Sequence, residues 1–133
     1  MYEIDTKLLK LEEAGTPIHV ALIGAGQMGK DIVAQISQMK GMVCDIVVDI
    51  NTDIAIEAFK QMKRQKEIVI TDCVDEAEKA ITEGKCVATT NYKVAVRTAQ
   101  IQSVIDATGS PEMGARVTME CVMYKKHIVM MNV

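Results

Sequence analysis

The sequence predicts an α/β fold with a doubly wound, mainly parallel sheet in a single domain. Three observations lead to this prediction. Apolar runs of strand length alternate with segments of helical periodicity, as in parallel sheets covered by helices on both faces. The first apolar run leads directly into a glycine-rich loop. The chain has 133 residues, 49% of them hydrophobic and 25% charged, which is enough for one hydrophobic core but not for two.

The predicted elements follow one another in a regular order. Residues 1–16 form a leading segment with a short helix over 6–13, which Gly15 and Pro17 end. The expected strands lie at 18–23, 43–50, 68–70, 86–88, 103–107 and 127–131. The expected helices lie at 27–39, 53–62 after a cap over 51–53, 75–83, 92–99 and 111–124. Ser110 as N-cap and Pro111 at the first helical position give the last helix a well-defined start.

Two hydrophobic patterns predict which parts of these elements are buried. In the helix over 27–39, four apolar residues recur at helical spacing and are expected to face the core. They are Met28, Ile32, Ile36 and Met39. The strand over 127–131 is almost continuously apolar, so we expect it to be buried.

The loop after the first strand is the first part of a predicted nucleotide site. Gly24, Gly26 and Gly29 form a G-x-G-x-x-G pattern. Its glycines permit a tight turn, a close approach of the backbone to a pyrophosphate, and close packing of the next helix. The N-terminus of that helix offers unpaired N–H groups to an anion. The residues assigned to this part are Gly24, Ala25, Gly26, Gln27, Met28 and Gly29. The alternative is an ordinary turn in a fold that binds something else or nothing.

The second part of the predicted site is Asp49, with Ile50 and Asn51 after it. Asp49 stands twenty residues beyond Gly29 at the end of an apolar run, where a carboxylate accepts hydrogen bonds from ribose hydroxyls. No arginine follows it, so NAD is slightly favoured over NADP as the cofactor. The alternative role for Asp49 is that of a helix-capping or turn acid.

The third part consists of Ala107, Thr108 and Gly109, at the end of the strand over 103–107. Small residues at this point let the nicotinamide half of a dinucleotide approach the backbone. The alternative is that Thr108 and Gly109 only form a turn before Pro111. No metal-ligand spacing or Ser/His/Asp grouping is present, so no metal site is expected and the catalytic residues stay unknown.

Several other polar residues are expected to have structural roles. His19 and His127 are interpreted as core or edge histidines, and Asp106 as a buried, hydrogen-bonded acid. A cluster of cations lies toward the end of the helix expected to end near residue 62, where positive charge complements the helix dipole. The cluster consists of Lys60, Lys63, Arg64 and Lys66, and a phosphate site is the alternative.

Composition excludes several classes of partner. The net charge is −3 without a basic face, so nucleic acid and anionic membranes are not expected partners. No apolar run reaches the roughly 18 residues of a membrane span, and a signal-peptide pattern is absent, so a cytoplasmic location is expected. The four cysteines form no C-x-x-C pair and are expected to be reduced and mostly buried.

The chain also resembles a known family. The block D-A-T-G-S-P-E-M-G-A-R-V over 106–117 and the ending K-H-I-V-M-M-N-V over 126–133 accompany the glycine loop and Asp49. With these motifs the chain resembles the N-terminal NAD(P)-binding domain of homoserine dehydrogenase-like oxidoreductases. The resemblance is strongest to the branch with a SAF domain, which includes deoxyxylulose phosphate reductoisomerase-like enzymes.

The resemblance implies that residues 1–133 are the NAD(P)-binding Rossmann domain of a longer oxidoreductase, with the catalytic and substrate domain absent. It implies hydride transfer to or from a small hydroxy- or phospho-substrate, and it allows a homo-oligomer. Asn132 would lie near the nicotinamide. Val133 stands where homoserine dehydrogenases carry a lysine, so this chain alone is expected to be inactive. The alternative is a non-catalytic nucleotide- or CoA-binding module, which would not need the carboxylate of Asp49.

Overall fold

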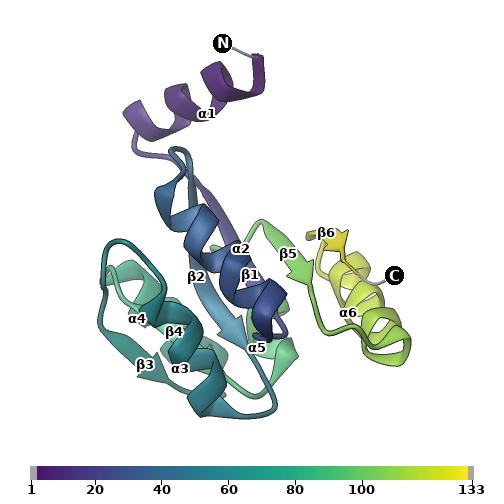
Figure 1. The fold of residues 1–133 in the computed structure, drawn as a ribbon. Helices are drawn as coiled ribbons and strands as arrows, with labels where there is room; N and C mark the ends of the chain where they lie inside the picture. The colour runs from purple at the N-terminus through teal and green to yellow at the C-terminus, as the bar shows by residue number, and fades with distance from the viewer. Residues whose placement is uncertain (1–2, 132–133) are drawn as a thin grey trace.

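The computed structural model describes residues 3–131, which form a six-stranded, wholly parallel sheet with helices on both faces (Figure 1). This confirms the predicted α/β fold. The strands are β1 (Ile18–Ile23), β2 (Met42–Val48), β3 (Ile68–Ile70), β4 (Cys86–Thr89), β5 (Ser103–Asp106) and β6 (His127–Met130). The helices are α1 (Glu3–Glu13), α2 (Gln27–Gln38), α3 (Thr52–Lys60), α4 (Val74–Thr82), α5 (Tyr92–Arg97) and α6 (Pro111–Met123).

The order of the strands is β3-β4-β2-β1-β5-β6. The chain therefore places β2, β3 and β4 on one side of β1, with β4 between β2 and the edge strand β3, and then crosses to the other side of β1 to add β5 and β6. This reversal at β1 is a topological switch point, and in open α/β sheets ligands bind beside such a point at the carboxyl ends of the strands. The ends of β1 and β2 that meet there lie in the lower part of Figure 1.

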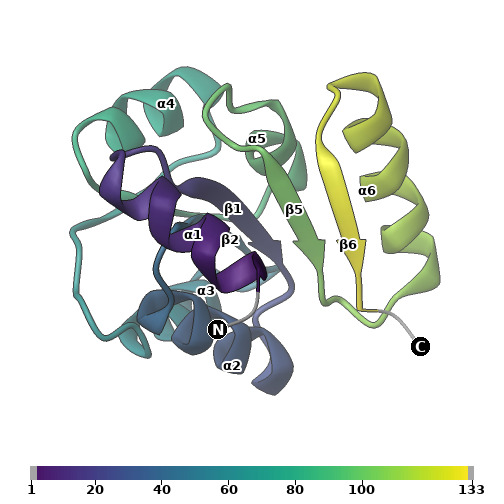
Figure 2. The ribbon, with the colours of Figure 1, turned by 90° about the horizontal axis from the view of Figure 1, so that it is seen from above.

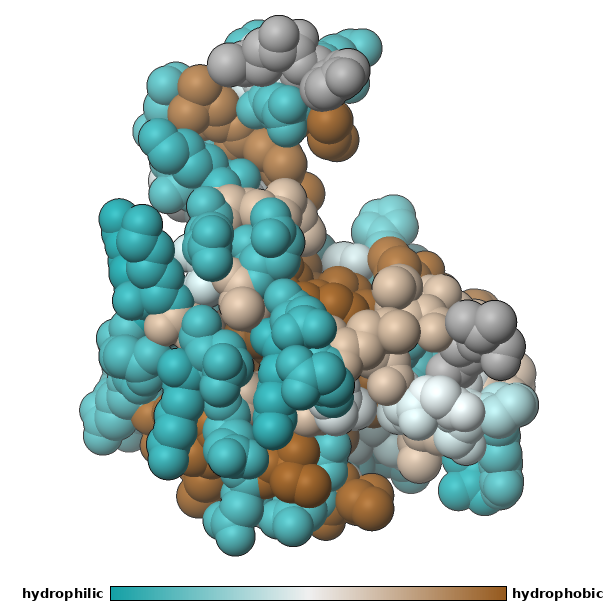
Figure 3. All heavy atoms as spheres, viewed as in Figure 1, coloured by the Kyte–Doolittle hydropathy of each residue, from teal (hydrophilic) through white to brown (hydrophobic). Residues whose placement is uncertain are grey.

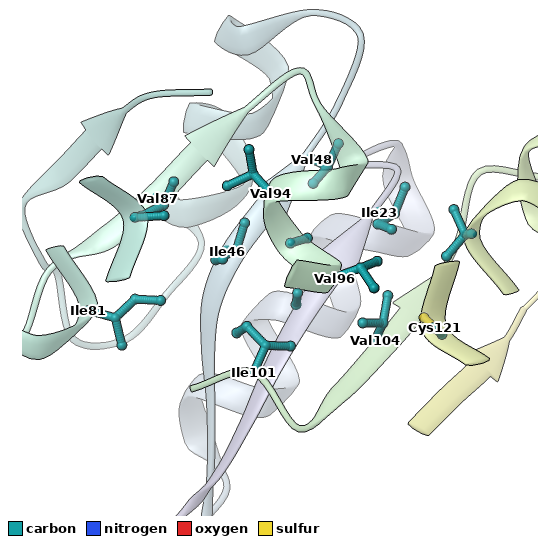
Figure 4. Close-up of a cluster of buried hydrophobic side chains, with 14 of the residues drawn as sticks. Ile23, Ile46, Val48, Ile81, Val87, Val94, Val96, Ile101, Val104 and Cys121 are labelled. Atoms are coloured by element: carbon teal, nitrogen blue, oxygen red, sulfur yellow. The ribbon is translucent and has the colours of Figure 1, made fainter. Parts of the chain in front are cut away.

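Two hydrophobic layers hold the sheet between its helices. On one face, Val33 of α2 and Phe59 of α3 pack against Leu22 and Val47. Helices α4, α5 and α6 cover the opposite face, as the view from above shows (Figure 2). In that layer the buried side chains of β1, β2, α5 and α6 interdigitate (Figure 4). Because both faces are covered, the central strands are mostly apolar rather than alternating, with His19 of β1 and Asp45 of β2 as the exceptions.

The buried side of α2 agrees with the prediction at Ile36, which is buried, and at Ile32, which packs against the core, but not at Met28. The buried residues are Gly29, Val33 and Ile36, whereas Met28 is 49% exposed. The helix begins so close to the sheet that only a glycine fits at its first contact, because a Cβ on Gly29 would clash with the carbonyl oxygen of Gly24. The outer side of α2 is hydrophilic, as the teal side chains in Figure 3 show.

Helix α3 ends at Lys60, earlier than the sequence predicted. The side chain of Gln65 folds back and donates to the carbonyl oxygens of Met62 (2.7 Å) and Lys60 (3.3 Å). These bonds satisfy carbonyl groups that a longer helix would have paired. Lys63, Arg64 and Lys66 consequently lie in the loop beyond the helix, so the prediction that the cation cluster belongs to a helix end is wrong for these three residues.

The last strand is also different from its prediction. Strand β6 is the edge of the sheet with only β5 beside it, and Val129 and Met130 are 46% and 49% exposed. Ile128 alone among its residues packs against the core. The expectation of a buried strand is wrong, because apolar composition does not reveal the position of a strand in the sheet. Asn132 lies outside the described residues.

Helix α1 extends away from the sheet at the end opposite the switch point (Figure 1). None of its residues is buried. It contacts the domain at Gly41, whose N–H donates to Glu12 Oε2 (2.8 Å) and whose Cα faces the backbone of Leu8. Among the helices of residues 3–131, none is long and apolar enough to cross a membrane.

Candidate functional site

A cleft of about 450 Å³ lies where the carboxyl ends of β1, β2, β4 and β5 meet. Its wall comes from the loops that follow these four strands and from the first turns of α5 and α6. The residues that line it are Ile23, Gly24, Ala25, Gly26, Val48, Asp49, Ile50, Thr90, Tyr92, Ala107, Thr108, Ser110 and Met113. The position agrees with the rule that parallel sheets bind ligands at a switch point.

Gly24 joins the two halves of this cleft. Its N–H donates to the carbonyl oxygen of Val48 (2.8 Å), which extends the pairing of β1 with β2 by one residue. Its φ of +95° lies in the region that side chains disfavour. A Cβ there would lie 2.7 Å from the carbonyl oxygen of Ala107 and 2.8 Å from the amide nitrogen of Thr108. Glycine is therefore required at this position by the fold alone.

Gly26 presents the opposite case. It is the N-cap of α2 with φ −68°, a value that any residue adopts, and a Cβ there would meet nothing within 4 Å. Neither backbone geometry nor packing within the described residues requires glycine. The N-terminus of α2 carries no side-chain cap bond, and the first backbone N–H groups of a helix have no partner within the helix. A glycine at this point fits a ligand that approaches the backbone closely, as a pyrophosphate does.

Asp49 follows β2 and is half-buried beside the glycine loop. Its Oδ2 accepts from the N–H of Ala25 (2.9 Å) and its Oδ1 from the N–H of Asn51 (3.0 Å). The first bond connects the carboxylate to the loop, and the second forms a local turn. Asn51, not Asp49, caps α3, because its side-chain oxygen accepts from the N–H of Asp53 (3.0 Å). The fixed carboxylate has further lone pairs that can accept hydroxyl hydrogens.

The loop after β5 closes the other side of the cleft. Asp106 is fully buried, and its Oδ1 accepts from the N–H of Thr108 (3.0 Å). The hydroxyl of Thr108 accepts from the N–H of Ser110 (3.2 Å), and Ser110 caps α6 through the N–H of Met113 (3.2 Å). This confirms Asp106 as a buried, hydrogen-bonded acid. Gly109 has φ +69°, which agrees with a turn at this residue.

The structure brings together seven of the twelve predicted site residues. Gly24, Ala25, Gly26, Asp49, Ile50, Ala107 and Thr108 line the cleft. Gln27, Met28, Gly29, Asn51 and Gly109 do not. Three of these have other contacts, since Gln27 bonds to Asp31, Asn51 caps α3 and Gly29 packs against the sheet.

Six further residues of the cleft were missed in the sequence. They are Ile23, Val48, Thr90, Tyr92, Ser110 and Met113. Their positions in the sequence could have indicated them, because each lies at the end of a strand or in the loop or helix turn that follows a strand. Thr90 and Tyr92 could be assigned only once β4 was known to lie beside β2, since strand order is not written in any local pattern.

The charge of the cleft is negative. Among its described lining residues Asp49 is the single carboxylate, and none is a lysine or arginine. His19 lies elsewhere in the sheet, with its Nδ1 2.5 Å from Oδ2 of Asp45, and His127 is exposed on β6. Both therefore have the structural positions predicted for them. No group of three or more metal-ligating side chains occurs within residues 3–131.

Comparison with known proteins supports the fold. No protein-family model and no curated protein matches the chain. The fold is similar to an NAD-binding oxidoreductase from Klebsiella pneumoniae, with a TM-score of 0.55 and 17% identity over 86% of this chain. An NAD-binding protein from Listeria innocua matches 86% of the chain at 12% identity with a TM-score of 0.40. The chain spans 27% of the Klebsiella protein and 35% of the Listeria protein. At this identity the likeness to the Klebsiella protein shows a shared α/β fold.

Proposed function

We propose that this chain is the dinucleotide-binding domain of an NAD(P)-dependent oxidoreductase. The observation that carries the proposal is the pairing of an open Gly26 with a fixed Asp49 at the switch point of the sheet. The first leaves room for a pyrophosphate against the N-terminus of α2, and the second offers a carboxylate to a ribose. The solved structure of similar fold from Klebsiella pneumoniae is described as an NAD-binding oxidoreductase, which supports the same function.

In this proposal each wall of the cleft binds a different part of the dinucleotide. The glycine loop with Gln27, Met28 and Gly29 binds the pyrophosphate, and Asp49 with Ile50 and Asn51 binds the adenosine half. Ala107, Thr108 and Gly109 lie beside the nicotinamide. The bound cofactor supplies the hydride, and the protein supplies its position and excludes competing reactions. The similarity of 106–117 and 126–133 to homoserine dehydrogenase-like enzymes favours a small hydroxy- or phospho-substrate, held by a further part of a longer, homo-oligomeric protein.

The charge of the cleft favours NAD over NADP. A 2′-phosphate would lie near the carboxylate of Asp49, and no lysine or arginine among the described lining residues would compensate its charge. A free 2′-hydroxyl instead donates a hydrogen bond to the same carboxylate. We therefore expect the chain to bind NADH more tightly than NADPH.

Calorimetry with NADH, NADPH and CoA tests the proposal, with Gly26→Val as the decisive variant. The valine methyl groups would fill the pyrophosphate site, whereas the backbone at φ −68° accepts valine. We expect NADH binding to be abolished and the thermal unfolding temperature to stay close to that of the wild type. Gln35→Val, on the exposed side of the same helix, should retain binding.

Three results would contradict this function. They are retained NADH affinity in Gly26→Val, equal loss in Gln35→Val, and CoA binding without a response to either nicotinamide dinucleotide. The last result would instead support a non-catalytic CoA-binding module.

Asp49 provides a second test through a substitution pair. Asp49→Ala should weaken NADH binding by roughly 10- to 100-fold, since hydrogen bonds to a charged acceptor contribute about 1.5–3 kcal/mol. NADPH affinity should fall less, because a repulsion disappears with the carboxylate. Asp49→Asn keeps the shape and one acceptor, so it should give an intermediate loss. Equal effects on the two cofactors would argue against contact between Asp49 and the ribose.

A further inference from the structure

The amino-terminal edge of the sheet contains a second cavity, on the opposite side of the domain from the cleft. It has a volume of about 360 Å³ and lies between the end of α2, the start of β2 and the loop after α3. Figure 1 shows this end of α2 directly beneath α1. The volume is at the lower end of the range of about 300–1,000 Å³ typical of small-molecule sites.

Four cations surround this cavity, and we call it the basic pocket. Lys40 follows α2, whereas Lys63, Arg64 and Lys66 come from the loop after α3. Within residues 3–131 none of the four forms an ion pair; of the other eleven lysines and arginines, five pair with a glutamate and six do not. Glu67, next in sequence to Lys66, pairs with Lys85 instead. Glu12, the one carboxylate that lines the cavity, accepts from the N–H of Gly41.

The dipole of α3 does not account for the three cations that follow it, whereas Lys40, next to the C-cap Met39 of α2, complements the dipole of that helix. The dipole of a helix acts within its last turn, and α3 ends at Lys60, so Lys63, Arg64 and Lys66 lie beyond its reach. Four like charges around one cavity repel one another in a protein whose net charge is −3. Of the four cations, Lys66 lies close enough to the buried acid Asp45 to affect its pKa. The positive charge of Lys66 lowers this pKa, although burial raises it more strongly.

The walls of the basic pocket are fixed by hydrogen bonds. The hydroxyl of Ser37 donates to the carbonyl oxygen of Ala34 (2.7 Å) and accepts from the N–H of Lys63 (3.1 Å), which fastens the loop to α2. Gln65 holds the same loop through the carbonyl oxygen of Met62, and Met62 is buried. These bonds fix the backbone that carries the cations, so the loop itself need not be ordered when an anion binds, whereas the side chains of Lys40, Lys63 and Arg64 are exposed.

We propose that the basic pocket binds a small molecule that carries a phosphate or pyrophosphate group. The four cations would contact the anionic group, since lysine and arginine form strong charge-assisted hydrogen bonds with phosphate. The inner wall is apolar and suits an organic body attached to that group. It consists of Val33, Met39, Met42, Val43 and Met62.

Amide NMR titration of the 133-residue chain tests the proposal, with inorganic phosphate and pyrophosphate as probes at constant ionic strength. We expect saturable shifts over residues 37–42 and 62–66, with tighter binding of pyrophosphate. Shifts over residues 24–29 would report the other cleft, so the two sites are distinguished in one spectrum.

A pair of charge-matched variants gives the control. Lys63→Gln with Arg64→Gln should weaken binding of the probe at the basic pocket by about tenfold or more, because two charge-assisted contacts are lost. Lys79→Gln with Lys93→Gln removes the same charge from exposed positions elsewhere and should change the affinity less than about twofold. Wild-type-like amide spectra establish that both variants are folded.

Three results would overturn the proposal. They are the absence of saturable shifts at the basic pocket, equal shifts with sodium chloride at the same ionic strength, and equal weakening in the two variants. None of these outcomes depends on whether the chain binds NADH.

Discussion

Gly24 and Gly26 lie two residues apart in one loop, yet the structure gives them different roles. Gly24 has a positive φ and touches the loop after β5, whereas Gly26 has an ordinary backbone conformation and open space around it. A sequence pattern cannot separate these cases, because both residues appear only as glycines of one motif. The difference predicts that one substitution damages folding and the other damages binding.

The change Gly24→Ala should destabilise the protein. The left-handed backbone costs a residue with a Cβ roughly 1–2 kcal/mol, and the contacts with Ala107 and Thr108 add an overpacking cost of about 1–3 kcal/mol. We expect the free energy of unfolding in urea to fall by roughly 2–5 kcal/mol. Gly26→Ala is the matched control and should change it by less than about 1 kcal/mol. Equal stability of the two variants would contradict the assignment.

At the scale of elements, β2 carries an irregularity that places an acid inside the sheet. The pairing of β1 with β2 shifts between Val20 and Ala21, and Asp45 is the additional residue on β2. Such bulges redirect a side chain, and here Asp45 is 2% exposed with its carboxylate against His19. Burial raises the pKa of Asp45, while the contact with His19 and the charge of Lys66 lower it less strongly.

Asp45→Asn tests this buried acid through the pH dependence of stability. A raised pKa means that the folded protein holds the proton more tightly than the unfolded chain does. Stability therefore falls as the pH rises from the ordinary aspartate value of about 3.9 through the folded pKa. In urea titrations the free energy of unfolding should fall over this pH range in the wild type but not in Asp45→Asn. The difference, variant minus wild type, should therefore rise with pH. Asp72→Asn, at an exposed position, should show no such rise, and a flat difference for Asp45→Asn would contradict the role of burial.

At the scale of the whole molecule, the four cysteines fall into two classes, buried and exposed. Cys44, Cys86 and Cys121 are buried in the two hydrophobic layers, whereas Cys73 is exposed, and all four are free thiols. Burial raises the pKa of Cys86 and of Cys121 to about 11 and raises that of Cys44 further. The sequence predicted reduced and mostly buried cysteines, and the structure identifies the exposed one.

Thiol titration with Ellman's reagent at pH 8 should therefore find one fast-reacting cysteine in the native protein and four in denaturant. The thiolate is the reactive form, and a buried thiol with a raised pKa is both inaccessible and protonated. Cys73→Ser should remove the fast phase completely. Two or more fast thiols in the native wild type would show that the layers open on the timescale of labelling.

The sequence determined the features that depend on short stretches of chain. Alternating apolar runs and amphipathic segments define the α/β fold, because burial on both faces of a sheet requires this pattern. The strand over 18–23, the glycine loop, a cap within 51–53 and the cap at Ser110 were predicted from local chemistry, and the structure has them, with Asn51 as the cap of α3.

The tertiary structure alone decided which residues meet. Strand order places Thr90 and Tyr92 beside Asp49, leaves β6 at the edge, and joins Lys40 to a loop more than twenty residues away. It also turns Met28 outward, because the packing of Gly29 sets the rotation of α2. These outcomes arise from contacts between distant segments, whose free energy depends on the whole arrangement and not on any local sequence pattern.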